Sequence, residues 1–272
     1  MPEAPDRAAW GSALTVGEFA AIRGAGFEPV GQVFGAAVFS SGSAGMYRCP
    51  GTSPASGSIA LFGPLVQAMY EARRVAIDRM ATQCAELGGH GVVGVRLTHG
   101  DFRLGGLEFT AIGTAVRAPG AASAGPGPRT PFTCDLSGQD FAKLVMAGWV
   151  PAGLALGISV GARHDDRATT RQTRWTAGNA EVAGWTELVG RCRHEARRAL
   201  DGDVRRLGGD GVVIAAMRMR VRARDCPATV GRHDHVVEAT VVGTAIAAFS
   251  RPARPDRPAR PARPDITTRI RV

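Results

Sequence analysis

The feature that most constrains this chain of 272 residues is an internal repeat. Three segments recur in the same order, 120 to 130 residues further along the chain. The matched pairs are Leu87–Val93 with Leu207–Val213, Leu107–Val116 with Val237–Ile246, and Phe19–Gly35 with Phe141–Gly157. Because the order is kept, the sequence predicts two copies of one structural unit.

Each copy is predicted to contain one long helix that ends at a glycine motif. Apolar residues recur there at spacings of three or four, which gives a helix one apolar face. These positions are Leu65, Met69, Ala72, Ala76, Met80, Cys84 and Leu87 in the first copy, and Trp185, Val189, Cys192, Ala196, Leu200, Val204 and Leu207 in the second. Gly88 and Gly208 are expected to end the two helices.

Segments rich in β-branched residues surround each helix and predict strands. These are residues 32–39, 92–97 and 107–116, and then 154–160, 212–217 and 237–246. Shorter helices are expected at Glu18–Ala25 and Gln139–Ala147. The predicted fold class is therefore α+β, with two tandem β-α-β-β units, each an antiparallel sheet with one long helix packed on it.

Composition sets the expected limits of the two units. The first repeat is placed at residues 12–117 and the second at 132–249. Residues 118–131 are mostly proline, glycine, alanine and serine, which is typical of a flexible linker. Residues 250–272 alternate arginine and proline over much of their length and predict an extended, disordered tail.

The repeated unit resembles the YbjQ family, whose name associates it with heavy-metal binding. The resemblance rests on Leu87–Gly94, Gly113–Val116, Trp185–Leu188 and Gly243–Ile246, and covers about residues 28–117 and 150–248. It implies a dodecin-like subunit fold, ring-like oligomers and a heavy-metal ion as ligand. The duplication, the extra N-terminal helix of each copy, the tail and a longer second hairpin depart from the family pattern.

Charge and motifs argue against several function classes. The net charge is +9, and residues 251–272 contribute seven arginines against two aspartates. Such an arginine-rich composition also arises in GC-rich genomes, so the charge alone does not establish nucleic-acid binding. Lys143 is the only lysine and lacks the glycines of a P-loop. HExxH is absent, and the GxSxG match at Gly157–Gly161 falls in the strand predicted at 154–160 instead of at the strand-to-helix turn that a nucleophile elbow needs. We therefore expect a non-enzymatic protein.

Five widely spaced cysteines do not predict a disulfide framework. Together with the absence of an apolar signal segment at the N-terminus, they favour the cytoplasm. No apolar run is long enough to span a membrane. Cys84 and Cys192 are expected in the core, whereas Cys49 and Cys134 are either single reactive thiols or packed residues.

The metal candidate is His233 with His235, because alternate residues of a strand share a face. Two ligands do not complete a site, so the alternative is a pair of histidines on a hairpin. Cys226 would join them only if the chain folded back. Residues 164–166, His-Asp-Asp, are expected in a solvated polar loop.

The anion candidate is the second hairpin, which is ten residues longer than the first. Alternation places four arginines on one face, where they are expected to bind an anion: Arg218, Arg220, Arg222 and Arg224. The expected register sets Val212 opposite Val242 and Arg220 opposite Asp234. The first hairpin is expected to set Val92 opposite Ile112 and Arg96 opposite Glu108.

These features predict a non-enzymatic, oligomeric binding or scaffold protein that takes a heavy metal or a small ligand. The alternative is a polyanion- or nucleic-acid-associated protein that acts through the arginine-proline tail and the 217–238 hairpin. Self-association is expected because the sheet face opposite the helix stays apolar. Val92, Ile112 and Val116, with Val212, Ile214 and Val242, must be covered by the sister repeat or by another chain.

Overall fold

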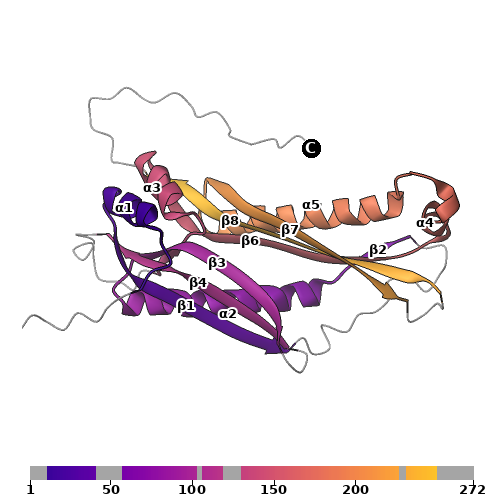
Figure 1. The fold of residues 1–272 in the computed structure, drawn as a ribbon, viewed down its shortest axis with the longest axis horizontal. Helices are drawn as coiled ribbons and strands as arrows, with labels where there is room; N and C mark the ends of the chain where they lie inside the picture. The colour runs from indigo at the N-terminus through magenta and orange to yellow at the C-terminus, as the bar shows by residue number, and fades with distance from the viewer. Residues whose placement is uncertain (1–10, 41–56, 103–105, 119–129, 227–230, 250–272) are drawn as a thin grey trace, which may run out of the picture.

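The computed structural model describes residues 11–40, 57–102, 106–118, 130–226 and 231–249 and confirms the α+β fold (Figure 1). The first half contains α1 Val16–Gly24, β1 Glu28–Ser40, β2 Ile59–Leu61, α2 Gly63–Glu86, β3 Gly91–Phe102 and β4 Gly106–Arg117. The second contains β5 Phe132–Thr133, α3 Gly138–Met146, β6 Trp149–His164, α4 Arg167–Gln172, the 3-10 turn η4 Trp175–Ala177, α5 Ala183–Arg206, β7 Gly211–Asp225 and β8 His233–Ala248. All the helices and strands expected from the sequence are present.

Two four-stranded sheets have the orders β1-β4-β3-β5 and β2-β6-β8-β7. Their three long strands are antiparallel and follow the same order, and each sheet carries one 24-residue helix. Strands β1 and β6 are the first long strands of the two repeats. Their pairing register shifts at corresponding positions, between Pro29 and Gly31 in β1 and between Pro151 and Gly153 in β6. The two tandem β-α-β-β units are thus confirmed, while the exact limits of the repeats stay predictions.

Each repeat contributes a short strand to the sheet of the other. Strand β2 comes from the first half but pairs with β6, at Ile59 opposite Arg163. Strand β5 comes from the second half but runs parallel to β3, where Phe132 pairs with Gly91. The repeats are therefore interleaved, which the sequence patterns did not predict.

The long hairpins pair in a register different from the expected one. In the first, Val92 pairs with Ala115 and Arg96 with Ile112. In the second, Val212 pairs with Ala245, Met219 with Ala239 and Arg220 with Glu238. The expected pairs were Val92 with Ile112, Arg96 with Glu108, Val212 with Val242 and Arg220 with Asp234, and all four are wrong.

The physical reason is a slip that the hydrophobic pattern does not detect. Each hairpin contains a bulge, between Val93 and Arg96 and between Ile214 and Ala216. Beyond the bulge the pairing differs from the expected one by four residues. An even slip leaves the side chains beyond the bulge on their predicted faces, because the side-chain period of a strand is two. Before the bulge the slip is three residues. Val92 and Val212, which were expected on the sheet face away from the helix, therefore pack with the α2 and α5 clusters instead. The arginine face of β7 is accordingly where it was predicted, with Glu238 opposite Arg220.

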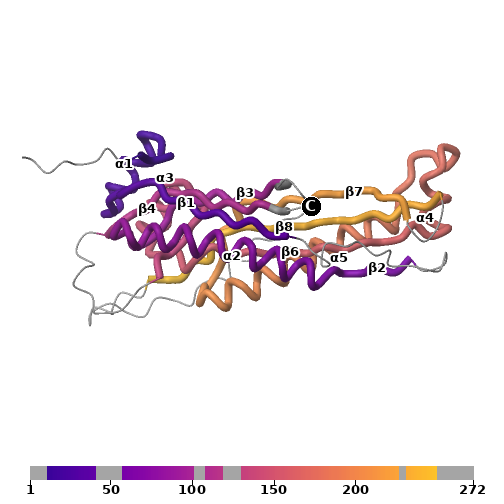
Figure 2. Tube along the Cα trace, turned by 90° about the horizontal axis from the view of Figure 1, so that it is seen from below, coloured from indigo at the N-terminus to yellow at the C-terminus, as the bar shows by residue number. Residues whose placement is uncertain are grey.

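The sister repeat supplies the second layer that the sheets need. Val116 packs in a cluster with Cys134 and Phe141 of the second half, and Val242 packs against the core of the first. Helix α5 covers the opposite face of the second sheet, and the first repeat lies below that sheet in Figure 1. Seen from below, the β7–β8 hairpin extends well past β3 and β4 (Figure 2).

The helix stripes form the centres of two cores. Helix α2 buries Met69, Ala72, Ala76, Met80 and Cys84, and α5 buries Leu188, Cys192, Ala196, Leu200 and Val204. The buried stripe of α2 ends earlier than expected, at Cys84, since Leu87 is exposed. Gly88 and Gly208, with φ of 69° and 71°, follow the helices in the left-handed conformation that glycine adopts readily. None of the described helices has the length and apolarity needed to cross a bilayer.

The described cysteines, Cys84, Cys134, Cys192 and Cys226, are all buried. Burial raises the pKa of Cys84 to about 11 and that of Cys134 to about 12. Both thiols therefore stay protonated at neutral pH, which supports the packing role for Cys134. Cys49, most of the predicted linker and the arginine-proline tail lie outside the described residues.

Each long helix approaches its sheet over a glycine. A Cβ added at Gly35 would lie 2.0 Å from the carbonyl oxygen of Ala76, and one at Gly157 would lie 2.0 Å from that of Ala196. No carbon atom fits at such a distance from a backbone oxygen. The same close contact thus fixes the helix on the first strand of each repeat.

We expect Gly157→Ala to lower the free energy of unfolding by about 1–3 kcal/mol, because the helix must shift to admit the methyl group. Gly202→Ala is the control, since its Cβ meets nothing within 4 Å and it lies inside α5. Alanine should stabilise that helix by about 1 kcal/mol. Urea unfolding measures both, and equal stability of the two variants would contradict the close contact.

Candidate metal centre

A buried imidazole and a buried carboxylate meet where β6 ends and β8 begins. His164 is the last residue of β6 and lies opposite Asp234, the second residue of β8. The His164 Nδ1 atom is 2.6 Å from Asp234 Oδ1. Their side chains are 1% and 0% exposed, so the pair is shielded from water. A shared proton or a cation is needed to hold these atoms together in such surroundings.

Cys226 brings a thiol to the same pair. It follows β7 directly, and its backbone N–H donates to the Arg232 carbonyl at 2.8 Å, which closes the end of the hairpin. The ligating atoms of His164, Cys226 and Asp234 all lie within 4.8 Å of one another, and all three residues are buried. Within the ranges that the structure describes, this is the one cluster of three such residues.

The face opposite the triad is held by Asp165. Its Oδ1 accepts hydrogen bonds from Trp185 Nε1 at 3.0 Å and from His235 Nδ1 at 3.1 Å. Burial opposes the charge of Asp165, but these hydrogen bonds outweigh it and keep the pKa of the carboxyl below its usual value. Arg232 also donates to the Asp165 carbonyl at 2.8 Å, so the neighbour of His164 is fixed on both sides.

The expectation of a solvated loop at residues 164–166 is therefore wrong. His164 and Asp165 are buried, and Asp166 caps α4 and pairs with Arg163 at 2.8 Å. The reason is the length of β6, which continues to His164 and carries this polar segment into the end of the second core.

The predicted metal pair, His233 and His235, is not brought together with a third ligand among the described residues. His233 is exposed and lies 3.1 Å from an Asp225 carboxylate oxygen. His235 contacts Asp165 and packs on the Trp185 ring, with the ring centroids 4.4 Å apart. Between them, Asp234 points to the other face, as alternation in a strand requires. The pair is untested as a metal site, whereas the triad uses Asp234.

Sequence reasoning missed His164 and Asp234 because each was assessed in its own segment. A signal was available: the first and last strands of a β-α-β-β unit pair, and both residues lie near the same end of those strands. Cys226 carried no such signal, since its position depends on how the hairpin closes.

The triad has the chemistry of a transition-metal site. Imidazole nitrogen, thiolate sulfur and carboxylate oxygen are all ligands of Zn²⁺. Ligand atoms around a tetrahedral zinc lie roughly 3.5 Å apart, given metal–ligand bonds of about 2.0–2.3 Å. Separations of up to 4.8 Å must therefore contract, whereas His164 Nδ1 and Asp234 Oδ1, now 2.6 Å apart, must move apart by about 1 Å. Three protein ligands would leave the fourth position to water or another donor.

The predicted arginines divide into two groups. Arg218 and Arg220 line a cavity between the repeats, whereas Arg222 and Arg224 are exposed further along β7. The hairpin tip with the triad and this cavity are separate places on the second sheet.

Comparison with known proteins agrees with this architecture. The sequence model of a family described as "YbjQ_1: Putative heavy-metal-binding" matches residues 21–119. A Mycobacterium tuberculosis protein named "Encapsulin nanocompartment protein Rv1762c" is 35% identical over 208 residues, covering 74% of this chain and 75% of that protein. A "UPF0145 protein" of Vibrio campbellii is 47% identical over 49 residues, covering 18% of this chain and 47% of that protein.

Proposed function

Because this chain belongs to the YbjQ family, we propose that it is a non-enzymatic protein that binds one transition-metal ion through His164, Cys226 and Asp234. The single observation that carries the proposal is the convergence of three different ligating atoms in a buried place. The family description names heavy metals, but the match covers residues 21–119 and none of the three ligands, so it supports metal binding by the family and not this particular site.

The mode of binding follows from the chemistry of the ligands. A metal ion takes these side chains without their ligand protons, so it displaces the thiol proton and any proton shared by His164 and Asp234. A lower pH therefore weakens binding. Cys226 is the softest of the three ligands, and thiolate favours Zn²⁺ over Mg²⁺ or Ca²⁺. The hydrogen bonds of Asp165 hold the adjoining backbone, which pre-organises His164.

We expect the full chain to bind one equivalent of Zn²⁺, and Cys226→Ala to weaken that binding at least tenfold because one of three ligands is lost. His164→Gln should act in the same way. Isothermal titration with zinc at neutral pH, together with native mass spectrometry, measures affinity and stoichiometry.

His233→Ala is the matched control, since that histidine is exposed beside the triad and supplies none of its ligands. It should bind zinc as the unaltered chain does. Loss of zinc in His233→Ala with full binding in Cys226→Ala would overturn the triad in favour of the neighbouring histidine pair. Circular dichroism shows whether each variant remains folded.

We further propose that the chain self-associates through β1 and β7. Helix α5 packs mainly on β6 and β8, so apolar side chains of β7 stay exposed: Val213, Ile214, Met217, Met219 and Val221. Strands β1 and β7 are also the long strands that end the two sheets. Strand β5 pairs with β3, but the corresponding edge of β7 has no such partner among the described residues. A second copy of the chain would supply that partner strand by pairing along the edge of β7.

Light scattering should give a mass well above the 28.4 kDa of one chain. Met217→Glu should shift the mass toward the monomer, because it places a charge on the apolar side of β7. Arg222→Glu, on the other face of the same strand, should leave the oligomer in place. A monomer at micromolar concentration would contradict the proposal.

Similarity to the Mycobacterium tuberculosis protein supports a location. The name of that relative refers to an encapsulin nanocompartment, and we infer that this chain is cytoplasmic and is enclosed in such a compartment. Co-expression with the encapsulin shell protein of the same organism tests this. The chain should co-elute with assembled shells and resist added protease until the shells are disrupted. Digestion at the same rate with and without shells would refute it.

A further inference from the structure

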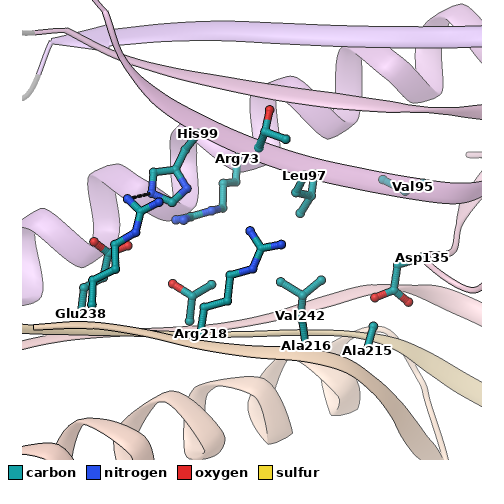
Figure 3. A pocket seen from close by; sticks show the side chains of 13 residues that line it. Arg73, Val95, Leu97, His99, Asp135, Ala215, Ala216, Arg218, Glu238 and Val242 are labelled. Atoms are coloured by element: carbon teal, nitrogen blue, oxygen red, sulfur yellow. Dashed lines mark hydrogen bonds between the residues drawn. The ribbon is translucent and has the colours of Figure 1, made fainter.

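A cavity of about 160 Å³ lies between the two repeats, away from the metal triad. Strand β3 and helix α2 form one wall, and β7 with β8 forms the other (Figure 3). Its residues come from both halves of the chain, so it exists only because the repeats are packed together. A space of this size admits a ligand of a few heavy atoms, smaller than the 300–1,000 Å³ typical of drug-sized ligands.

A buried arginine points into this cavity. The Arg73 side chain leaves α2 and extends into the space below His99 (Figure 3). Arg73 is only 4% exposed, and its Nη1 atom has no hydrogen-bond partner in the described structure. The guanidinium carbon of Arg73 lies 5.0 Å from the centroid of the Phe109 ring. A buried guanidinium donor without an acceptor is costly, and an anionic ligand would remove that cost.

Two further arginines face Arg73 from the other repeat. Arg218 extends from β7 into the centre of the cavity (Figure 3). Arg220 Nη1 donates to His99 Nε2 at 2.6 Å, which requires that nitrogen to be unprotonated. Burial, and then the charge of Arg220, lowers the pKa of His99. His99 therefore orients Arg220 and adds no positive charge of its own.

The rest of the lining defines the shape of the ligand. Val95, Leu97 and Val242 form an apolar side. Two acids also line the cavity, Glu238 beside the arginines and Asp135 at the far end (Figure 3). Neither forms an ion pair with the three arginines. Thr244 donates to one oxygen of Asp135, and the other oxygen is buried without a partner. The cavity is thus lined by three guanidinium groups and two carboxyl groups, so positively charged groups are in excess.

We propose that this cavity binds a small organic anion. Its oxyanion group, carboxylate or phosphoryl, meets the three guanidinium groups, and its short apolar body lies along the valine and leucine side. The site needs both repeats, since Arg73 belongs to the first and Arg218 to the second. It is independent of the metal centre, because none of its residues belongs to the triad.

Calorimetric titration of the full chain at constant ionic strength tests the proposal with three probes of similar size. Butyrate carries a carboxylate, n-butyl phosphate carries a phosphoryl group, and butyramide is the neutral analogue of butyrate. At least one anion should bind, at least tenfold more tightly than butyramide. Comparison of the two anions identifies the head group. Equal affinity for all three, or no binding of either anion, would overturn the proposal.

Variants separate this site from a general attraction of anions to a basic chain. Arg218→Gln, at an exposed position, should weaken binding of the better anion at least tenfold, and Arg73→Met should do the same. Arg222→Gln is the control, because it removes the same charge from the same face of β7 outside the cavity. Glu238→Gln should strengthen binding, since it removes a competing carboxylate. If Arg73→Met does not fold, Arg218→Gln and Glu238→Gln decide the question. Equal losses for Arg218→Gln and Arg222→Gln would refute a built site.

Discussion

The contact of a helix with a glycine of a strand sets the geometry of both repeats. Gly35 meets the backbone of α2 and Gly157 that of α5, closely enough to exclude a methyl group. The helix residues at these contacts are small, since Ala76 and Ala196 occupy corresponding stripe positions. Such a helix covers only part of a three-stranded sheet. The remaining apolar area needs a second layer.

The exchange of short strands follows from that need. Strands β2 and β5 each extend the sheet of the opposite repeat, which joins the two halves by backbone hydrogen bonds as well as by packing. Leu154 and Val242 of the second half enter the core of the first. Neither repeat is complete alone, and the cavity that holds Arg73 and Arg218 is formed where they meet. Duplication within one chain fixes this relation, whereas two separate chains would have to find it by association.

The difference between the repeats is concentrated at the hairpins. The second hairpin is ten residues longer and extends past β3 and β4, and Cys226 and Asp234 belong to the end of this hairpin. The metal triad is therefore a property of the second copy. A family resemblance that rests on the motifs shared by both copies does not reveal it, because the ligands lie in the part that they do not share.

The sequence predicted those features that depend on periodicity. The stripe from Met69 to Cys84 and the arginine face of β7 follow from side-chain spacing, and both are where they were expected. Features that depend on register or on approach from another segment were missed. Beyond the bulges, the four-residue slip of the hairpins leaves each face unchanged, so no pattern distinguishes it. Arg73 follows Ala72 on α2 as an ordinary charged neighbour of the apolar stripe. Only the position of the second sheet shows that it is buried.

The two candidate sites share a strand face, so their charges must be considered together. Asp234 and Glu238 lie four residues apart on β8, roughly 13 Å at the rise of an extended strand. That distance exceeds the Debye length of about 8–10 Å at physiological salt. A divalent ion at the triad brings two positive charges but displaces one or two protons, so the net change is at most one unit of charge. Salt screens buried groups such as the triad less than exposed ones, so it is mainly the small change in charge, acting over this distance, that keeps the electrostatic coupling of the two sites weak. The two ligands would then act on one another chiefly through a movement of the hairpin itself.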